Sequence, residues 1–179
     1  MSRDLPLLLD DPQVRAVIAG RMTVTRRIDP VWAQVRAGDV LWVRECHAIA
    51  TGHLYDGLAV VRYRADGQIV ARSASAADRL PRMLSMGRWR PSTQMPRWAC
   101  RLYLEVVSVE QERGLLGGGL GQMAVVAPRV TDEEARMQGL AGRSDFVAAW
   151  LRRYPRHVGP VWRVEFRILG GVFMAEVRS

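Results

Sequence analysis

The chain has 179 residues, of which 49% are hydrophobic and 25% are charged. This length fits one compact domain, and the composition excludes wholesale disorder. The 26 arginines and lysines exceed the 18 acidic residues and give a formal net charge of +8, which indicates an anionic partner. All 26 are arginines, so chemistry that needs a lysine amine is excluded.

The sequence contains no apolar run near the roughly 18 residues of a membrane span. The two cysteines, Cys46 and Cys100, match no metal-ligand spacing and are too few for a disulfide framework. We therefore expect a cytoplasmic protein that uses no membrane, metal or cofactor.

The first predicted helix covers residues 12–19. Asp11 and Pro12 fit its N-cap and first position, and Gly20 fits its end. The polar, basic segment 20–27 follows directly, at a point where a loop is expected.

Two strands are predicted next, at 40–43 and near 58–64. The first is a short apolar run after a Gly-Asp turn, and its alternation puts Trp42 and Arg44 on one face. Glycines, prolines and a Ser/Ala-rich stretch then predict an irregular connection over 65–97.

The clearest strand pattern begins at Trp98, where apolar residues alternate with polar ones, so that Arg101 is expected on the wet face. The glycine-rich segment 114–121 predicts a mobile loop. Another alternating strand begins at Val161. The side chains predicted to form the centre of the core are Trp98, Cys100, Leu102, Leu104, Trp162, Val164 and Phe166.

Two further helices are predicted between these strands. Thr131 and Glu134 form a capping-box pattern, and Gly139 fits the end of that helix. Ser144 is the predicted cap of the next helix, which ends before Pro155. An apolar stripe follows its inner face, formed by Phe146, Val147, Trp150, Leu151 and Tyr154. Short strands and short helices together indicate an α+β domain with a curled or closed sheet.

The histidines and cysteines do not form a recognisable catalytic or metal-binding pattern. Cys46 and His47 are strand neighbours whose side chains point to opposite faces, so they are not expected to form a nucleophile and base. His47, His53 and His157 share no ligand spacing and are expected to be solvated or capping side chains.

Arginines interleaved with aromatic residues are more informative. They occur at 62–64, 88–90 and 97–98. An arginine beside a ring can neutralise a phosphate and stack a base. The alternative interpretation is an ordinary solvated face. A second basic group, Arg21 with Arg26 and Arg27, follows the end of the first helix, where it can also balance the helix dipole.

Several segments in this order resemble one known family. The segments are Val14 to Arg21 with Thr23 and Thr25-Arg26-Arg27, Gly38 to Glu45, Trp89-Arg90-Pro91-Ser92, Met95 to Ala99, Arg101 to Val106, and Pro160 to Phe166. Together they resemble the ASCH domain family of the PUA-like superfamily, most closely its phage- and prophage-encoded members. The resemblance covers nearly all of 1–179 as a single domain, except insertions near 65–87 and 114–130.

The resemblance implies a small PUA-like β-barrel with flanking short helices. It also implies binding of RNA, other single-stranded nucleic acid or a nucleotide in a basic cleft next to the 20–27 signature loop. The residues expected to bind are Arg21, Thr23, Thr25, Arg26, Arg27, Arg44, Arg90, Ser92 and Arg97.

Some family members resemble amidohydrolases that deacylate acetylated cytidine with a lysine, a threonine three residues later and a glutamate. Here Thr25 matches the threonine, but Met22 and Gln138 stand at the other two positions. Neither a thioether nor an amide accepts a proton at neutral pH, so Thr25 lacks its activating groups. Glu45 is a substitute base, or else a carboxylate paired with Arg26, Arg27 or Arg44.

Three functions therefore stay open from the sequence. The favoured one is a binding domain for nucleic acid or a nucleotide, with little or no catalysis. The second is a divergent hydrolase of a modified nucleoside or of RNA, with Thr25 and Glu45 as reactive groups. The third is a phage protein-interaction module whose basic face binds an acidic protein.

Overall fold

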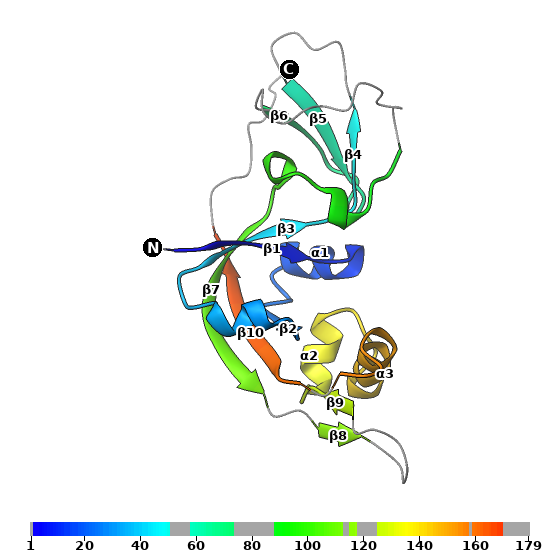
Figure 1. Cartoon of the computed structure of the whole chain (residues 1–179). Coiled ribbons are helices and arrows are strands. Elements are labelled where there is room, and N and C mark those ends of the chain that lie inside the picture. The colour runs from blue at the N-terminus through cyan, green and yellow to red at the C-terminus, as the bar shows by residue number, and fades with distance from the viewer. Residues whose placement is uncertain are drawn as a thin grey trace. The chain divides into compact units, whose positions relative to one another are not determined.

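The computed structural model in Figure 1 describes residues 2–50, 58–73, 88–112, 115–117, 125–157 and 159–169. Helices and strands occur together, which confirms the α+β class. The chain divides into two compact units that each take several stretches of sequence, and they are described separately below. Unit 1 consists of Met1–Arg3, Ala16–Asp39 and Glu105–Arg167, and unit 2 of Asp4–Arg15, Val40–Leu104 and Ile168–Ser179.

The elements follow the chain in this order: β1 (Asp4–Leu8), α1 (Asp11–Ile18), β2 (Val24–Arg27), the 3₁₀ helix η1 (Pro30–Gln34), β3 (Val40–Arg44), β4 (His47–Ala50), β5 (Leu58–Tyr63), β6 (Ile69–Ser73), the 3₁₀ helices η2 (Ser92–Gln94) and η3 (Arg97–Ala99), β7 (Tyr103–Glu112), β8 (Leu115–Gly117), β9 (Val125–Ala127), α2 (Asp132–Met137), α3 (Arg143–Arg153) and β10 (Val161–Ile168). None of the helices among the described residues is long and apolar enough to cross a membrane.

Strand β7 starts in unit 2 and continues in unit 1. Within unit 2 the strand order is β1-β3-β7, and β1 pairs with β3 in parallel. Within unit 1 the order is β7-β10-β2, and β10 pairs with β2 antiparallel. Unit 2 also contains the antiparallel sheet β4-β5-β6, and unit 1 the small antiparallel pair β8-β9.

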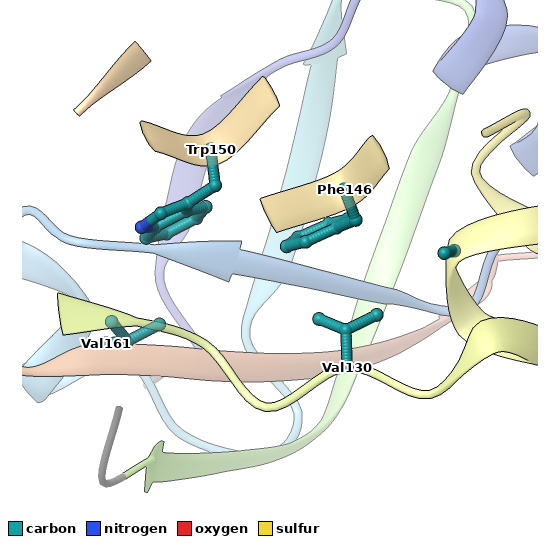
Figure 2. Packing of buried hydrophobic residues seen from close by; sticks show 5 residues of the cluster. Val130, Phe146, Trp150 and Val161 are labelled. Carbon is teal, nitrogen blue, oxygen red and sulfur yellow. The ribbon is translucent and has the colours of Figure 1, made fainter. Parts of the chain in front are cut away.

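Helices α2 and α3 lie against each other in unit 1 (Figure 1) and cover an apolar cluster. Figure 2 shows the rings of Phe146 and Trp150 pointing from α3 toward Val130 and Val161. The two rings are stacked with centroids 6.2 Å apart. The predicted apolar stripe of this helix is therefore confirmed, since its other members pack on the same cluster.

Unit 2 has its own cluster, built from Ile49, Val61, Tyr63, Met95 and Ala99. The Tyr63 hydroxyl donates a hydrogen bond of 2.8 Å to the Ala99 carbonyl, which ties β5 to η3. This buried ring and its polar tip fix the path of the segment that carries the two 3₁₀ helices.

The helices form where expected, but two caps differ from the prediction. The N-cap of α1 is Asp10 rather than Asp11, because the Asp10 carboxylate accepts from the Gln13 amide at 2.9 Å. Helix α3 starts one residue before Ser144, and the Asp132 carboxylate accepts from the Arg143 amide at 2.8 Å. The capping box at the start of α2 is confirmed.

Three predictions about loops and strands need correction. Segment 20–27 is not all loop, because 24–27 forms strand β2 against β10. The connection 65–97 contains strand β6, which pairs antiparallel with β5, and the 3₁₀ helix η2. Within 114–121, residues 115–117 form strand β8. The predicted mobility of 118–121 and the histidine at 53 lie outside the described residues.

The predicted core is largely confirmed. Five of the seven predicted residues are buried: Cys100, Leu102, Leu104, Val164 and Phe166. Trp98 and Trp162 are half-buried. The strand starts at Tyr103 instead of Trp98, because 97–99 turns as η3. Arg101, expected on the wet face, is buried with carboxylate partners.

Candidate functional site

The predicted site residues divide between the two units, and each group is described within its own unit. In unit 1, Thr25, Arg26 and Arg27 are all buried on β2, and Thr25 is only 3% exposed. Arg21 and Thr23, just before the strand, are exposed. The strand pairs with β10, and its Arg26 contacts Glu134 of α2 and lies 6.0 Å from the ring centroid of Phe146 on α3.

The charge of Arg26 is neutralised inside unit 1. Its Nε and Nη2 donate to Glu112 at 3.0–3.2 Å, and its Nη2 also donates to Glu134 at 3.1 Å. The same nitrogen donates to the Arg129 carbonyl at 2.8 Å. With two carboxylates on it, Arg26 ties β2 to β7 and α2. Arg27 lies with its guanidinium carbon 5.9 Å from the Trp32 ring centroid.

A cavity of about 160 Å³ lies beside the start of β2 in unit 1. Its lining consists of Met22, Thr23, Val24, Glu134, Met137, Gln138, Arg163 and Glu165. Met22 and Gln138, which the resemblance put at two of the three hydrolase positions, thus share one cavity. Thr25 is absent from the lining, and the threonine that lines the cavity is Thr23.

Glu134 is held in its charged form at this cavity. Arg26 lies 3.1 Å from its carboxylate, and Arg163 lies 3.5 Å away. Burial acts to raise the pKa of Glu134, but the charge of Arg26 and the hydrogen bond from the Thr131 amide lower it overall. A carboxylate in this state can accept a hydrogen bond but cannot donate a proton at neutral pH.

In unit 2, Glu45 is completely buried and bonded to Arg101. Nε and Nη2 of Arg101 each lie 2.8 Å from one Glu45 oxygen. Burial raises the pKa of Glu45, and the hydrogen bonds from Arg101 partly offset that rise. The expected partners were Arg26, Arg27 or Arg44, so the structure corrects the partner. With both oxygens engaged and no exposure, Glu45 has no access to a substrate here.

Cys46 and His47 follow Glu45 and are also buried. The expectation of a solvated or capping histidine is therefore wrong for His47. Its Nδ1 lies 3.2 Å from the Glu45 carbonyl, and burial lowers its pKa, so the ring is neutral at neutral pH. Burial raises the pKa of the Cys46 thiol. A neutral thiol is a poor nucleophile, so these neighbours do not form an activated pair.

The interleaved arginines and aromatics of unit 2 do come together. The Arg62 guanidinium carbon lies 4.6 Å from the centroid of the Trp89 ring, although the two residues belong to β5 and to the segment before η2. Trp89 is 37% exposed, so part of its ring is accessible for stacking on a ligand. We call Arg62, Trp89 and Arg90 the Arg–Trp surface.

A pocket of about 400 Å³ adjoins this surface, and we call it the Asp10–Arg90 pocket. Its lining consists of Leu9, Asp10, Asp11, Cys46, Arg64, Trp89, Arg90, Pro91 and Ser92. The backbones of Arg90 and His47 exchange two hydrogen bonds, with N–O distances of 2.7 and 3.2 Å, which fix the position of Arg90. The predicted residues Arg90 and Ser92 therefore share one pocket with the exposed indole.

The remaining predicted arginines of unit 2 have partners on the protein. Arg44 donates to the Thr93 carbonyl and lies 5.3 Å from the Trp42 ring centroid. Arg97 is exposed and paired with Asp4. Both are anchored at the surface, where a ligand phosphate would compete with these contacts.

The sequence interpretation missed the acidic members of both cavities. The sequence predicts only a capping role for Glu134, and it predicts no role for Asp10. The signal for Asp10 is its spacing of three residues from Gln13, a capping-box pattern. Nothing in the sequence brings Asp10 next to Arg90, because that proximity depends on the fold. Among the described residues, no group of three or more His, Cys, Asp or Glu side chains is arranged to hold a metal ion.

The comparisons with known proteins add no relative: no family model, no curated protein and no solved structure matches this chain.

Proposed function

We propose that this chain binds nucleic acid or a nucleotide through the Arg–Trp surface of unit 2. The observation that carries the proposal is the contact of Arg62 with the exposed Trp89, at 4.6 Å from the ring centroid. The Arg62 guanidinium lies over the Trp89 ring and supplies positive charge next to the part of this side chain that stays exposed. Bases stack on exposed aromatic rings, and the neighbouring cation neutralises the phosphate.

The charge on this surface supports the proposal. Among the described residues, neither Arg62 nor Arg90 forms an ion pair with a carboxylate, whereas Arg26, Arg97 and Arg101 each do. An unpaired arginine keeps its full charge for a ligand. The whole chain also has a net charge of +8, which favours binding of an anionic ligand.

The proposal extends to the fold family. We infer an ASCH-type, PUA-like domain of the phage and prophage kind, acting in the cytoplasm, whose sheet closes as a small barrel. The segments that resemble the family supply strands β2, β3, β7 and β10 and the two 3₁₀ helices η2 and η3. In this proposal Thr25, Arg26 and Arg27 support the fold of unit 1, and Arg90 and Ser92 contact the ligand.

Fluorescence anisotropy with short single-stranded RNA and DNA, at low and moderate salt, tests the proposal. We expect binding that weakens as salt rises, because arginine–phosphate contacts release counterions. Trp89→Ala removes the stacking face, worth about 1–3 kcal/mol per base. Arg90→Ala should reduce the salt dependence by about one counterion.

The matched control is Arg152→Ala, which removes an exposed arginine of α3 in unit 1 that has no ion pair among the described residues. It should leave the affinity almost unchanged. The proposal fails if neither RNA nor DNA binds at low salt. It also fails if Trp89→Ala and Arg90→Ala bind as tightly as the control.

A second candidate function, hydrolysis of a modified nucleoside, is favoured by the cavity of unit 1. There Thr23 and Glu165 line one small space. Glu165 accepts from the Ser108 hydroxyl at 3.3 Å and lies 3.5 Å from Arg163, so it is held in place as a hydrogen-bond acceptor. A carboxylate that removes a proton from a hydroxyl is the minimum for nucleophilic attack. Nucleoside turnover by the wild type that is lost in Thr23→Ala and kept in Thr25→Ala would support this second function over the favoured one.

A further inference from the structure

We infer that the Asp10–Arg90 pocket selects ribose over deoxyribose, with the Asp10 carboxylate accepting a hydrogen bond from the 2′-hydroxyl of one nucleotide. This inference rests on the proposed function, since it names the ligand class of that site. Trp89 and Arg90 belong both to the Arg–Trp surface and to the lining of the pocket. Its volume of about 400 Å³ is on the scale of one small-molecule ligand.

Four charged side chains line the pocket, and two of them neutralise each other. Nε of Arg64 lies 2.6 Å from Oδ2 of Asp11, which joins β5's end to the start of α1. The carboxylate of Asp10 and the guanidinium of Arg90 are the other two. The pocket therefore presents one negatively charged hydrogen-bond acceptor and one positively charged hydrogen-bond donor to a ligand.

The Asp10 carboxylate is held in place by α1. Its Oδ1 accepts from the Gln13 amide at 2.9 Å, and the Asp10 amide donates to the Gln13 side-chain oxygen at 3.2 Å. This reciprocal pair uses one carboxylate oxygen. Among the described residues, the second oxygen, Oδ2, has no hydrogen-bond partner, and the side chain is exposed. Asp10 thus offers a fixed acceptor at the wall of the pocket.

A carboxylate in a phosphate-binding pocket is unfavourable unless the ligand brings a donor to it, because like charges repel. A nucleotide has donors on its sugar hydroxyls and on some base amino groups. The base is assigned to Trp89 and the phosphate to Arg90, and the sugar connects the two. The sugar hydroxyls are therefore the donors that belong opposite Asp10, and the 2′-hydroxyl is present only in ribose. The Ser92 hydroxyl adds a neutral polar group to the same lining.

The test compares RNA and DNA strands of identical sequence, and ribonucleoside with deoxyribonucleoside monophosphates, on wild type and Asp10→Asn. Asparagine is as good an N-cap as aspartate, so α1 is retained while the charged acceptor is lost. We expect wild type to prefer the ribose ligand by about tenfold or more, the size of one hydrogen bond to a charged group. Asp10→Asn should reduce this preference to about twofold or less.

Asp132→Asn is the matched control, because Asp132 also caps a helix through its carboxylate but lies in unit 1 outside this pocket. It should keep the full ribose preference. Competition by the free ribonucleotide as strong as that by RNA would identify a mononucleotide as the ligand, and weaker competition would identify a strand. In either case the ribonucleotide should compete better than the deoxyribonucleotide, and equal competition by the two contradicts the assignment of the ribose to Asp10.

Three results would overturn the inference. One is equal binding of RNA and DNA by wild type. Another is a ribose preference that survives in Asp10→Asn. The third is a change in base preference with unchanged sugar preference, which would assign Asp10 to a base amino group. Each of these leaves the proposed function standing, whereas the absence of any binding overturns the proposed function itself.

Discussion

Arg101 and Glu45 form a two-pronged ion pair inside unit 2, with both N–O distances at 2.8 Å and side-chain exposures of 1% and 0%. Arg101 also donates to Asp66 at 2.7 Å and lies 4.0 Å from the Tyr63 ring centroid. Arg101→Met should therefore lower the free energy of unfolding by about 3–5 kcal/mol, because it leaves a buried carboxylate without its partner. Urea unfolding measures the loss.

The double variant Arg101→Met with Glu45→Leu separates pairing from packing. Replacing both charges by apolar side chains of similar volume is often neutral or stabilising, so the double variant should be more stable than Arg101→Met alone. If the double variant is less stable than either single variant, the pair contributes net stability. The attraction between the two charges then exceeds the cost of removing them from water.

This pair illustrates what the sequence could not provide. The alternation from Tyr103 to Val106 predicted the buried face of β7 correctly, because period-two patterns reflect a strand with one wet face. The same alternation put Arg101 on the wet face. Its burial depends on Glu45 and Asp66, which are distant in sequence, and pairing between distant charges leaves no periodic signal.

The stability of unit 2 should depend on pH through His47. Burial, together with the charges of Arg90 and Arg44, lowers its pKa below the ordinary value of 6.5. Below about pH 6.5 the unfolded chain binds a proton that the folded chain excludes. The free energy of unfolding should therefore fall as the pH drops through this range, by at most about 1.4 kcal/mol per pH unit.

His47→Gln removes this titration and keeps a side chain that can donate to the Glu45 carbonyl. Its unfolding free energy should change less than that of wild type just below pH 6.5. Glu134 and Asp39 have pKa values lowered below 4.5 and 3.8, so their stabilising contributions are lost only in more acidic solution. An unchanged pH profile in His47→Gln would exclude His47 as the cause.

Arg26 should matter for folding more than for binding. Arg26→Ala removes the closer of the two cations that Glu112 and Glu134 share, at a position where the arginine side chain is only 2% exposed. Arg163 remains, but at 4.0 Å from Glu112 and 3.5 Å from Glu134. The cost should be several kcal/mol of unfolding free energy. The matched variant Arg21→Ala removes an exposed arginine on the same segment and should change stability by less than about 0.5 kcal/mol. Thermal unfolding of the two variants, run in parallel, decides whether Arg26 is structural.

Two aromatic residues of β10 should differ in their contribution to stability. Phe166 is 2% exposed, whereas Trp162 is only half-buried. Phe166→Ala should cost about 3–5 kcal/mol, the range for a large side chain removed from a core, and Trp162→Ala should cost less. Equal losses in urea unfolding would mean that Trp162 packs as tightly as Phe166.

The candidate site shows a similar division between what the sequence predicts and what depends on the fold. The arginine–aromatic pattern at 62–64 and 88–90 correctly marked two segments that meet at Trp89. The basic pattern at 21–27 did not reveal which arginines are buried, because Glu112 and Glu134 lie far along the chain. Charge composition thus predicts the sign of the net surface charge. Which of the charged side chains can bind a ligand depends on their tertiary contacts.

The last prediction concerns hydrolysis at the cavity of unit 1. Wild type should not hydrolyse acetylated cytidine at a useful rate, because Met22 and Gln138 supply no proton acceptor where the resemblance implies a lysine and a glutamate. Both side chains line one cavity, so Met22→Lys with Gln138→Glu would install opposite charges facing a common space. Met22→Lys alone puts a charge at a position that is 2% exposed and should destabilise the protein.

The double variant should therefore be more stable than Met22→Lys alone and should show turnover that neither single variant has. Adding Thr23→Ala or Thr25→Ala to it identifies the nucleophile by nucleoside assay. Because Thr23 lines the cavity and Thr25 does not, we expect Thr23→Ala to abolish the turnover. Robust turnover by the wild type would instead show that Glu134 or Glu165 activates a hydroxyl without lysine. Loss of turnover only with Thr25→Ala would mean that the buried threonine becomes accessible when substrate binds.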